Sequence, residues 1–203
     1  ITRRFYTGAM SRALFIVDVQ NDFTEGGALG VDGGDAVALA ISEYLAAHHS
    51  DYALVVASRD WHDADSDNGG HFAAETPPDF VTSWPVHCVA GTPGADYDPG
   101  LDLTHIDQHL KKGQGRPAYS LFEGTADGGG TAGALLTQHG VIDLDIVGIA
   151  TDYCVRATAL DAIAHGVHVR VFTDLIAGVA EASSQAARAE LAHAGAELVD
   201  SRG

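Results

Sequence analysis

The sequence predicts a doubly wound α/β fold, in which helices cover both faces of a parallel sheet. The first indication is a set of short runs that are almost uniformly apolar, as strands covered on both faces are. The second is that helical patterns separate these runs, so that strand and helix alternate along the chain. Alternation of this kind leads to right-handed crossovers and parallel neighbouring strands.

Five apolar runs are predicted to be strands, and four segments between them have helical patterns. The strands are expected at residues 13–19, 52–58, 144–150, 167–172 and 196–199. The helices are expected at residues 36–49, 131–139, 154–165 and 183–195. Residues 59–130 break the rhythm, being rich in Asp, His, Gly and Pro, with one further strand near 109–112. An irregular region this long inside a compact domain is usually functional.

The length of the chain indicates one domain. Its 203 residues, 46% hydrophobic and 19% charged, are those of a folded globular protein. A chain of this length buries roughly 70% of the surface that its unfolded form exposes. We expect the domain to span residues 10–203. Residues 1–9, which precede Met10, are interpreted as an upstream extension or an expression remnant.

The net charge of −17 argues against binding to nucleic acid or to an anionic membrane, because both present phosphate groups. A small neutral substrate is not affected by such a field. The sequence has no apolar run of membrane-spanning length and no secretion signal, which predicts a cytoplasmic protein. The two cysteines, Cys88 and Cys154, are therefore expected to stay reduced rather than pair.

Cys154 is the candidate nucleophile. It follows an apolar strand and the pair Thr151-Asp152, either of which could cap the next helix. In the first helical turn, the free backbone N–H groups favour an anion, which predicts a lowered thiol pKa and a site for an oxyanion. The alternative is that Cys154 is a small hydrophobic residue of the core.

Two other residues could assist the thiol. Asp18, at the end of the first strand, could accept the thiol proton and return it to a leaving amine. Lys112 could stabilise both the thiolate and the carboxylate. Taken singly, Asp18 could equally cap a turn and Lys112 could be solvated, and neighbouring Lys111 leaves the choice of lysine open. Together with Cys154, however, they indicate a cysteine-dependent amidase.

A candidate metal site lies in the sequence between Asp18 and Lys112. Asp60 and His62 follow a strand, and His71 and His87 come from the next loops. One carboxylate and three imidazoles suit a divalent metal such as Zn, Fe, Mn or Ni. The chain has 11 histidines, so chance proximity is the alternative.

The motifs make the chain resemble the nicotinamidase/pyrazinamidase branch of the isochorismatase-like cysteine hydrolases, over residues 12–200. The matching segments are VDVQNDF (17–23), RDWH (59–62), HF (71–72), SWPVHCV (83–89), GTPGADY (91–97), AYSLFEG (118–124) and GIATDYCVRATALDA (148–162). The resemblance implies a three-layer α/β/α fold of Rossmann-like type with a six-stranded parallel sheet. It also implies hydrolysis of nicotinamide, and of pyrazinamide, in NAD salvage.

The resemblance further assigns roles to residues. It implies a catalytic triad of Asp18, Lys112 and Cys154. It also implies four metal ligands, which are Asp60, His62, His71 and His87. It implies a cis peptide between Ile149 and Ala150, which directs the N–H groups of Ala150 and Cys154 to an oxyanion. Phe23, Trp84 and Tyr119 would be walls of a pyridine pocket, with core packing as the alternative. The metal would bind the pyridine nitrogen, directly or through water. Tyr153 departs from the pattern, because histidine occurs there in related enzymes.

Three other functions are the alternatives. A vinyl-ether hydrolase of the isochorismatase type would need neither the cysteine nor the metal ligands. An amidase for a carbamoyl or ureido substrate would normally lack the full ligand set and Trp84. A non-catalytic small-molecule-binding protein of the same fold should have lost a triad residue. The sequence leaves open the identity of the metal, the breadth of amide specificity and whether the chain forms a homo-oligomer.

Overall fold

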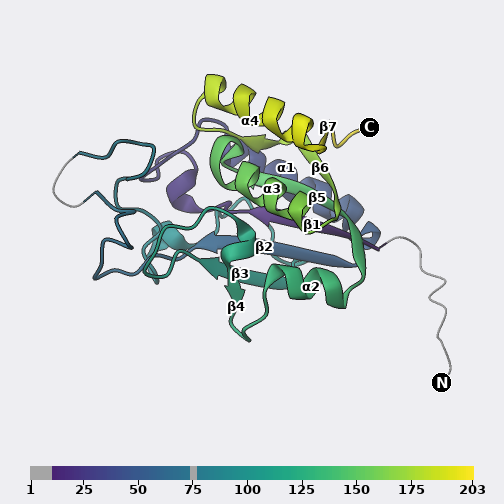
Figure 1. Ribbon diagram of the computed structural model, residues 1–203, viewed down its shortest axis with the longest axis horizontal. Helices are drawn as coiled ribbons and strands as arrows, with labels where there is room; N and C mark the ends of the chain where they lie inside the picture. Colours follow the sequence, from purple (N-terminus) through teal and green to yellow (C-terminus); the bar gives the residue numbers. More distant parts are fainter. Residues whose placement is uncertain (1–10, 74–76) are drawn as a thin grey trace.

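A computed structural model describes residues 11–73 and 77–203, in which helices flank a central sheet (Figure 1). Within these residues the sheet has seven strands in the order β4-β3-β2-β1-β5-β6-β7. The predicted extension, residues 1–9, lies outside the described part of the chain. The strands are β1 Ser11–Val17, β2 Leu54–Asp60, β3 Gln108–Lys112, β4 Thr125–Ala126, β5 Val141–Ile149, β6 His168–Ala177 and β7 Glu197–Val199.

The doubly wound fold is confirmed. Six strands, in the spatial order β3-β2-β1-β5-β6-β7, pair in parallel with their neighbours. The seventh strand, β4, is a two-residue addition that pairs antiparallel with β3 at the edge. The sequence gives no sign of β4, because two residues are too few to form a pattern. The strands β5 and β6 are longer than the predicted segments, and β1 and β2 are shifted by two residues.

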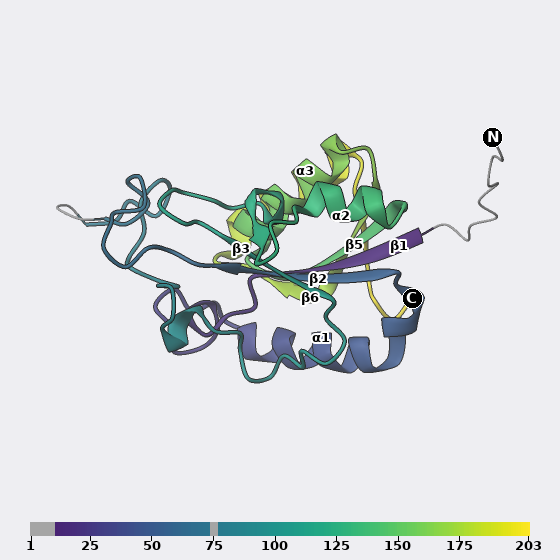
Figure 2. The ribbon, with the colours of Figure 1, turned by 90° about the horizontal axis from the view of Figure 1, so that it is seen from below.

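Helices cover both faces of the sheet (Figure 2). The helices are α1 Gly34–His48, α2 Ala132–Gln138, α3 Arg156–Ala164 and α4 Glu181–Ala194. Alternate residues of β1 point to opposite faces, as the pleat of a strand requires. Leu14 and Ile16 pack with the apolar side of α1, whereas Phe15 packs with residues of α2, α3 and α4. The sheet therefore has a hydrophobic core on each side.

The order of the strands creates a switch point between β1 and β5. From β1 the chain proceeds outward through β2 and β3, and it later returns to β5 on the other side of β1. In open α/β sheets, ligands bind beyond the carboxyl ends of the strands at this point. The long irregular segment after β2 folds over these ends, where isolated bridges join His62 to Val89 and Phe72 to Trp84.

Two expectations about the chain as a whole can be compared with the structure. Cys88 and Cys154, which are expected to stay reduced, are both free and buried in the structure. Among the described residues, no helix combines the length of a membrane span with its apolar character.

Candidate active site

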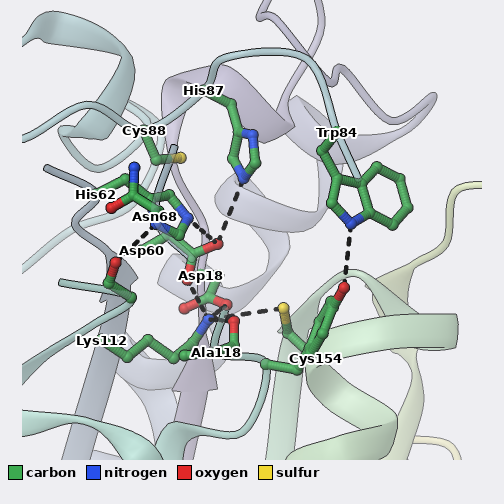
Figure 3. A network of polar contacts seen from close by, with 12 residues as sticks. Asp18, Asp60, His62, Asn68, Trp84, His87, Cys88, Lys112, Ala118 and Cys154 are labelled. Carbon is green, nitrogen blue, oxygen red and sulfur yellow. Dashed lines mark hydrogen bonds and ion pairs between the residues drawn. The ribbon is translucent and has the colours of Figure 1, made fainter. Parts of the chain in front are cut away.

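Four polar side chains meet at the carboxyl ends of four strands (Figure 3). Asp18 directly follows β1, Asp60 ends β2, Lys112 ends β3, and Cys154 lies in the turn after β5. All four are buried, with at most 6% of any residue exposed. The structure thus brings the predicted trio together and places one of the predicted metal ligands, Asp60, beside it.

Lys112 is the centre of this group. Its Nζ lies 2.9 Å from Oδ2 of Asp18, forms a second ion pair with Oδ1 of Asp60, and lies 3.7 Å from Sγ of Cys154. Burial alone would lower the pKa of Lys112, but the charges of Asp18 and Asp60 outweigh it and raise the pKa well above its ordinary value. Lys111 instead pairs with the exposed Asp127. Lys112 is therefore the lysine that belongs to the site.

Asp18 lies near the thiol and is held by one hydrogen bond and one ion pair. Its Oδ1 accepts a hydrogen bond of 2.7 Å from Oγ of Ser58, and its Oδ2 faces Lys112. Ligand atoms of Asp18, Asp60 and Cys154 all lie within 4.8 Å of one another. Burial raises the pKa of Asp18, although Lys112 and Ser58 lower it. Asp18 can therefore exchange a proton with the thiol at a pH closer to neutrality than an exposed aspartate.

The predicted lowering of the Cys154 thiol pKa is wrong for this structure. Burial, the largest influence, raises the pKa well above the ordinary value, and the charges of Asp18 and Asp60 add to the rise. Lys112 acts in the opposite direction but does not reverse the shift. The resting state is therefore a neutral thiol beside a base, as in other cysteine and serine nucleophiles that are activated by proton transfer.

The turn that carries Cys154 differs from the prediction. Residues Thr151–Val155 form a π-helical turn before α3, and neither Thr151 nor Asp152 caps a helix. The Asp152 carboxylate instead accepts hydrogen bonds from the N–H groups of Val179 and Ala180. Single π-helical turns occur frequently at functional sites. The peptide between Ile149 and Ala150 is cis, as the resemblance implies.

The three predicted histidine ligands form a second cluster, next to Asp60. Ring nitrogens of His62, His71 and His87 lie within 4.8 Å of one another. Oδ2 of Asp60 lies 3.6 Å from Nε2 of His62 and 3.8 Å from Nε2 of His87. The two oxygens of Asp60 thus have different neighbours, because Oδ1 faces Lys112 and Oδ2 faces the imidazoles.

Backbone carbonyl groups orient two of these rings. Nδ1 of His62 lies 2.8 Å from the Gly113 carbonyl oxygen, and Nδ1 of His87 lies 2.7 Å from that of Pro85. Each Nε2 is left to face the cluster, the usual arrangement around a metal ligand. Gly113 has a φ of +86°, and a Cβ there would lie 2.5 Å from Cε1 of His62. A glycine is therefore required behind the His62 ring.

The donor set fits a divalent transition metal. Nε2 of His62 and Nδ1 of His71 are buried and have no hydrogen-bond partner in the described part of the chain. Burial, then the neighbouring His62 and His87, lowers the pKa of His71 to about 3, and burial lowers the pKa of His87. Neutral imidazoles with free lone pairs, next to a carboxylate, are the ligands that such metals take.

A cavity of about 280 Å³ joins the two clusters. Its walls include the three predicted pocket residues, Phe23, Trp84 and Tyr119, together with Cys154 and His71. Trp84 is held in place by its indole N–H, which donates a 3.0 Å hydrogen bond to the Tyr119 hydroxyl oxygen. Mostly apolar walls with a few convergent polar groups are typical of a small-molecule site.

Several residues of the site are absent from the sequence prediction. Ser58 has a usable signal, because it precedes Asp60 by two positions on one strand and so points to the same face. Phe80, Val179 and the segment 28–31 also line the cavity, but they come from loops with no distinctive pattern. The carbonyl groups of Pro85 and Gly113 cannot be found in this way, because a backbone group carries no sequence signal.

The fold and the site together define a class of protein, a cysteine hydrolase built on a doubly wound α/β sheet with a candidate metal centre. The chain belongs to the isochorismatase family, whose domain model, "Isochorismatase domain", matches residues 12–203.

Relatives and solved structures agree with this assignment. The chain is 52% identical to the nicotinamidase/pyrazinamidase of Mycobacterium tuberculosis over 188 residues, which cover 93% of this chain and 98% of that protein. The crystal structure of pyrazinamidase of Pyrococcus horikoshii in complex with zinc is 36% identical, with a TM-score of 0.79 over 94% of this chain and 99% of that one. An L. infantum structure in complex with nicotinate is 34% identical, with a TM-score of 0.80 over 95% and 94%.

Proposed function

We propose that this protein hydrolyses nicotinamide to nicotinate and ammonia, and pyrazinamide in the same way, as a step of NAD salvage. One observation carries the proposal, namely that a single aromatic-walled cavity is lined both by Cys154, behind which Lys112 and Asp18 lie, and by His71 and His87 of the histidine cluster. A small aromatic ring that carries both a ring nitrogen and a carboxamide can contact both clusters at once, the nitrogen at the histidines and the carboxamide at Cys154. The high identity to a nicotinamidase/pyrazinamidase supports this choice of substrate.

In the first half of the reaction, Sγ of Cys154 attacks the amide carbon while Asp18 accepts the thiol proton. The pKa of both groups is raised, so the thiol remains protonated until Asp18 removes its proton during attack. Lys112, charged and 3.7 Å from Sγ, stabilises the negative charge that develops there. The N–H groups of Ala150 and Cys154 receive the oxyanion. Asp18 then gives its proton to the leaving nitrogen, and ammonia departs from a thioester.

In the second half, water attacks the thioester and Asp18 accepts the proton of that water. Collapse of the tetrahedral intermediate breaks the C–S bond, releases the carboxylic acid product and returns a proton to the sulfur. The same carboxylate thus acts as base, acid and base again, as microscopic reversibility permits. Ser58, which donates to Oδ1, keeps the other oxygen of Asp18 directed toward Lys112 and the thiol.

Asp60, His62, His71 and His87 would hold one divalent metal, for which Zn, Fe and Mn are the candidates. When bound, it would supply a Lewis acid for the pyridine nitrogen, directly or through a water. Phe23 and Trp84 would bind the two faces of the ring and so direct the carboxamide toward Cys154. Because the cavity walls are mostly apolar, they also exclude water from the reacting groups.

The alternatives have less support. An amidase for an aliphatic carbamoyl substrate would have no use for buried imidazoles beside aromatic walls. A non-catalytic binding protein would not need a lysine buried between two carboxylates and a thiol, which is costly to maintain. We also propose that the protein acts in the cytoplasm on a small molecule, without nucleic acid or membrane, because its chemistry needs a reduced Cys154.

The direct test is ammonia release from nicotinamide, pyrazinamide and an aliphatic amide. We expect wild type to release ammonia from both aromatic amides and far more slowly from the aliphatic one. Cys154→Ala and chelator-treated protein should be inactive, and restoring a divalent metal should restore only the treated wild type. Cys88→Ala is the matched control, because Cys88 is also buried but lies outside the cavity lining. Wild type that is inactive on both aromatic amides would overturn the proposal.

A further inference from the structure

The segment from Asp79 to Trp84 contributes Phe80 and Trp84 to the cavity lining, and its backbone includes a strained residue. Phe80 adopts a φ of +56°, a conformation that is rare for a bulky residue. The Asp79 carboxylate accepts hydrogen bonds of 2.8 to 2.9 Å from the backbone N–H groups of residues 81–83. A strained residue of this kind persists where its surroundings hold it, commonly at a ligand clamp.

Tyr153 connects this segment to the turn that carries Cys154. Its hydroxyl donates a 3.3 Å hydrogen bond to the carbonyl oxygen of Phe80, across 73 positions of sequence. Its ring also meets Trp84 edge-on, with the centroids 4.9 Å apart and an interplanar angle of 90°. Tyr153 therefore contacts the outer segment at two places, the strained turn and the indole that walls the cavity.

The same residue lines the cavity, together with Phe80 and Val179. About half of each of these two side chains is exposed, so they mark the point where the cavity opens to solvent. The indole N–H of Trp84 is bonded to Tyr119, and the segment that carries Trp84 is bonded to Tyr153 at Phe80. The bond between Tyr153 and Phe80 thus joins two residues that both line the cavity.

We propose that Tyr153 is a positioning residue that latches the Phe80 turn, and with it Trp84, over the mouth of the cavity, and so limits the size of the aromatic amide that enters. The substrate named here rests on the proposed function, whereas the latch rests on geometry alone. Tyr153 takes no part in proton transfer. Its effect falls on substrate binding and on selectivity by ring size.

The variant Tyr153→Phe isolates the hydroxyl, because it keeps the ring that packs on Trp84. We expect KM for nicotinamide to rise about two- to fivefold, the effect of losing one ordinary hydrogen bond. The value of kcat should stay within about twofold of wild type, since Asp18, Lys112 and Cys154 are not touched. The ratio of kcat/KM for nicotinamide to kcat/KM for the bicyclic quinoline-3-carboxamide should fall. Tyr44→Phe, which loses a tyrosine hydroxyl bond in α1, is the matched control and should change none of these.

A second measurement needs no turnover. The chain has two tryptophans, so the change Trp61→Phe leaves Trp84 as the single indole fluorophore. Trp84 is only 5% exposed, and we expect acrylamide to quench its fluorescence more strongly once Tyr153→Phe releases the segment. This experiment uses the full chain with metal added equally to both proteins.

The outcomes separate the latch from the proposed function. Wild type that releases no ammonia refutes the proposed function, and quenching alone then decides the latch. If wild type is active, an unchanged KM or unchanged quenching in Tyr153→Phe overturns the latch. A fall in kcat at constant KM also overturns it, because the residue would then act on the chemistry.

Discussion

Replacing Lys112 by methionine should greatly reduce the free energy of unfolding of the protein. The side chain is 0% exposed and its Nζ lies between the carboxylates of Asp18 and Asp60. Methionine keeps most of the apolar stem, so the change removes the charge while leaving little empty volume. What remains is a pair of buried carboxylates without their cation.

The size of the effect follows from this geometry. At 2.9 Å, and with an effective dielectric constant of about 20, the attraction between Lys112 and Asp18 alone is about 6 kcal/mol. Desolvation offsets much of it, and removing one partner of a buried pair typically costs about 3 to 5 kcal/mol. A domain is stable by only about 5 to 15 kcal/mol, so the loss is a large fraction of the total.

The assay is urea unfolding followed by circular dichroism, at one fixed metal concentration because bound metal adds to stability. Lys111→Met is the matched control and should stay close to wild type, since its ion pair with Asp127 is exposed. The double variant Lys112→Met/Asp18→Asn should be more stable than the sum of the single changes predicts. Strict additivity, or a Lys112→Met protein as stable as the Lys111→Met control, would show that Lys112 does not stabilise the two buried carboxylates.

Two further predictions concern the neighbours of the trio. Ser58→Ala removes a donor that lowers the pKa of Asp18, so that pKa should rise and the acidic limb of the profile of kcat/KM against pH should move to higher pH. Asp18 must be ionised to act as the base, and an unmoved limb would contradict its role. His71→Ala should reduce the divalent metal retained after gel filtration, measured by mass spectrometry of the element, and should abolish ammonia release. His139→Ala, a change at a histidine outside the cluster, should retain as much metal as wild type.

The strand ends can be predicted from the sequence because they depend on local patterns. The end of an apolar run marks the approximate carboxyl end of a strand, and this pattern places Asp18, Asp60 and Cys154 near such ends. It does not choose between Lys111 and Lys112. The structure resolves the choice, because β3 pairs Lys112 directly with Asp60, while Lys111 points to the other face of the strand.

Other features depend on packing that no local pattern contains. The sequence predicts the wrong direction for the thiol pKa because it reveals the helix terminus but not the burial that outweighs it. Asp152 has the sequence context of a helix cap, but its partners, Val179 and Ala180, lie on a distant connection. The hydrogen bond between Tyr153 and Phe80 also joins residues that are distant in the sequence, and no local pattern indicates that they are partners.

In the proposed reaction, Cys154 forms a thioester with the acyl group of an aromatic amide. Rapid acid quenching during turnover of nicotinamide, followed by mass spectrometry of the intact chain and of its peptides, measures this directly. We expect a transient adduct with the mass of one nicotinoyl group on the peptide that contains Cys154, present in Cys88→Ala and absent in Cys154→Ala. Nicotinate production with no adduct in wild type, or production that survives in Cys154→Ala, would contradict it.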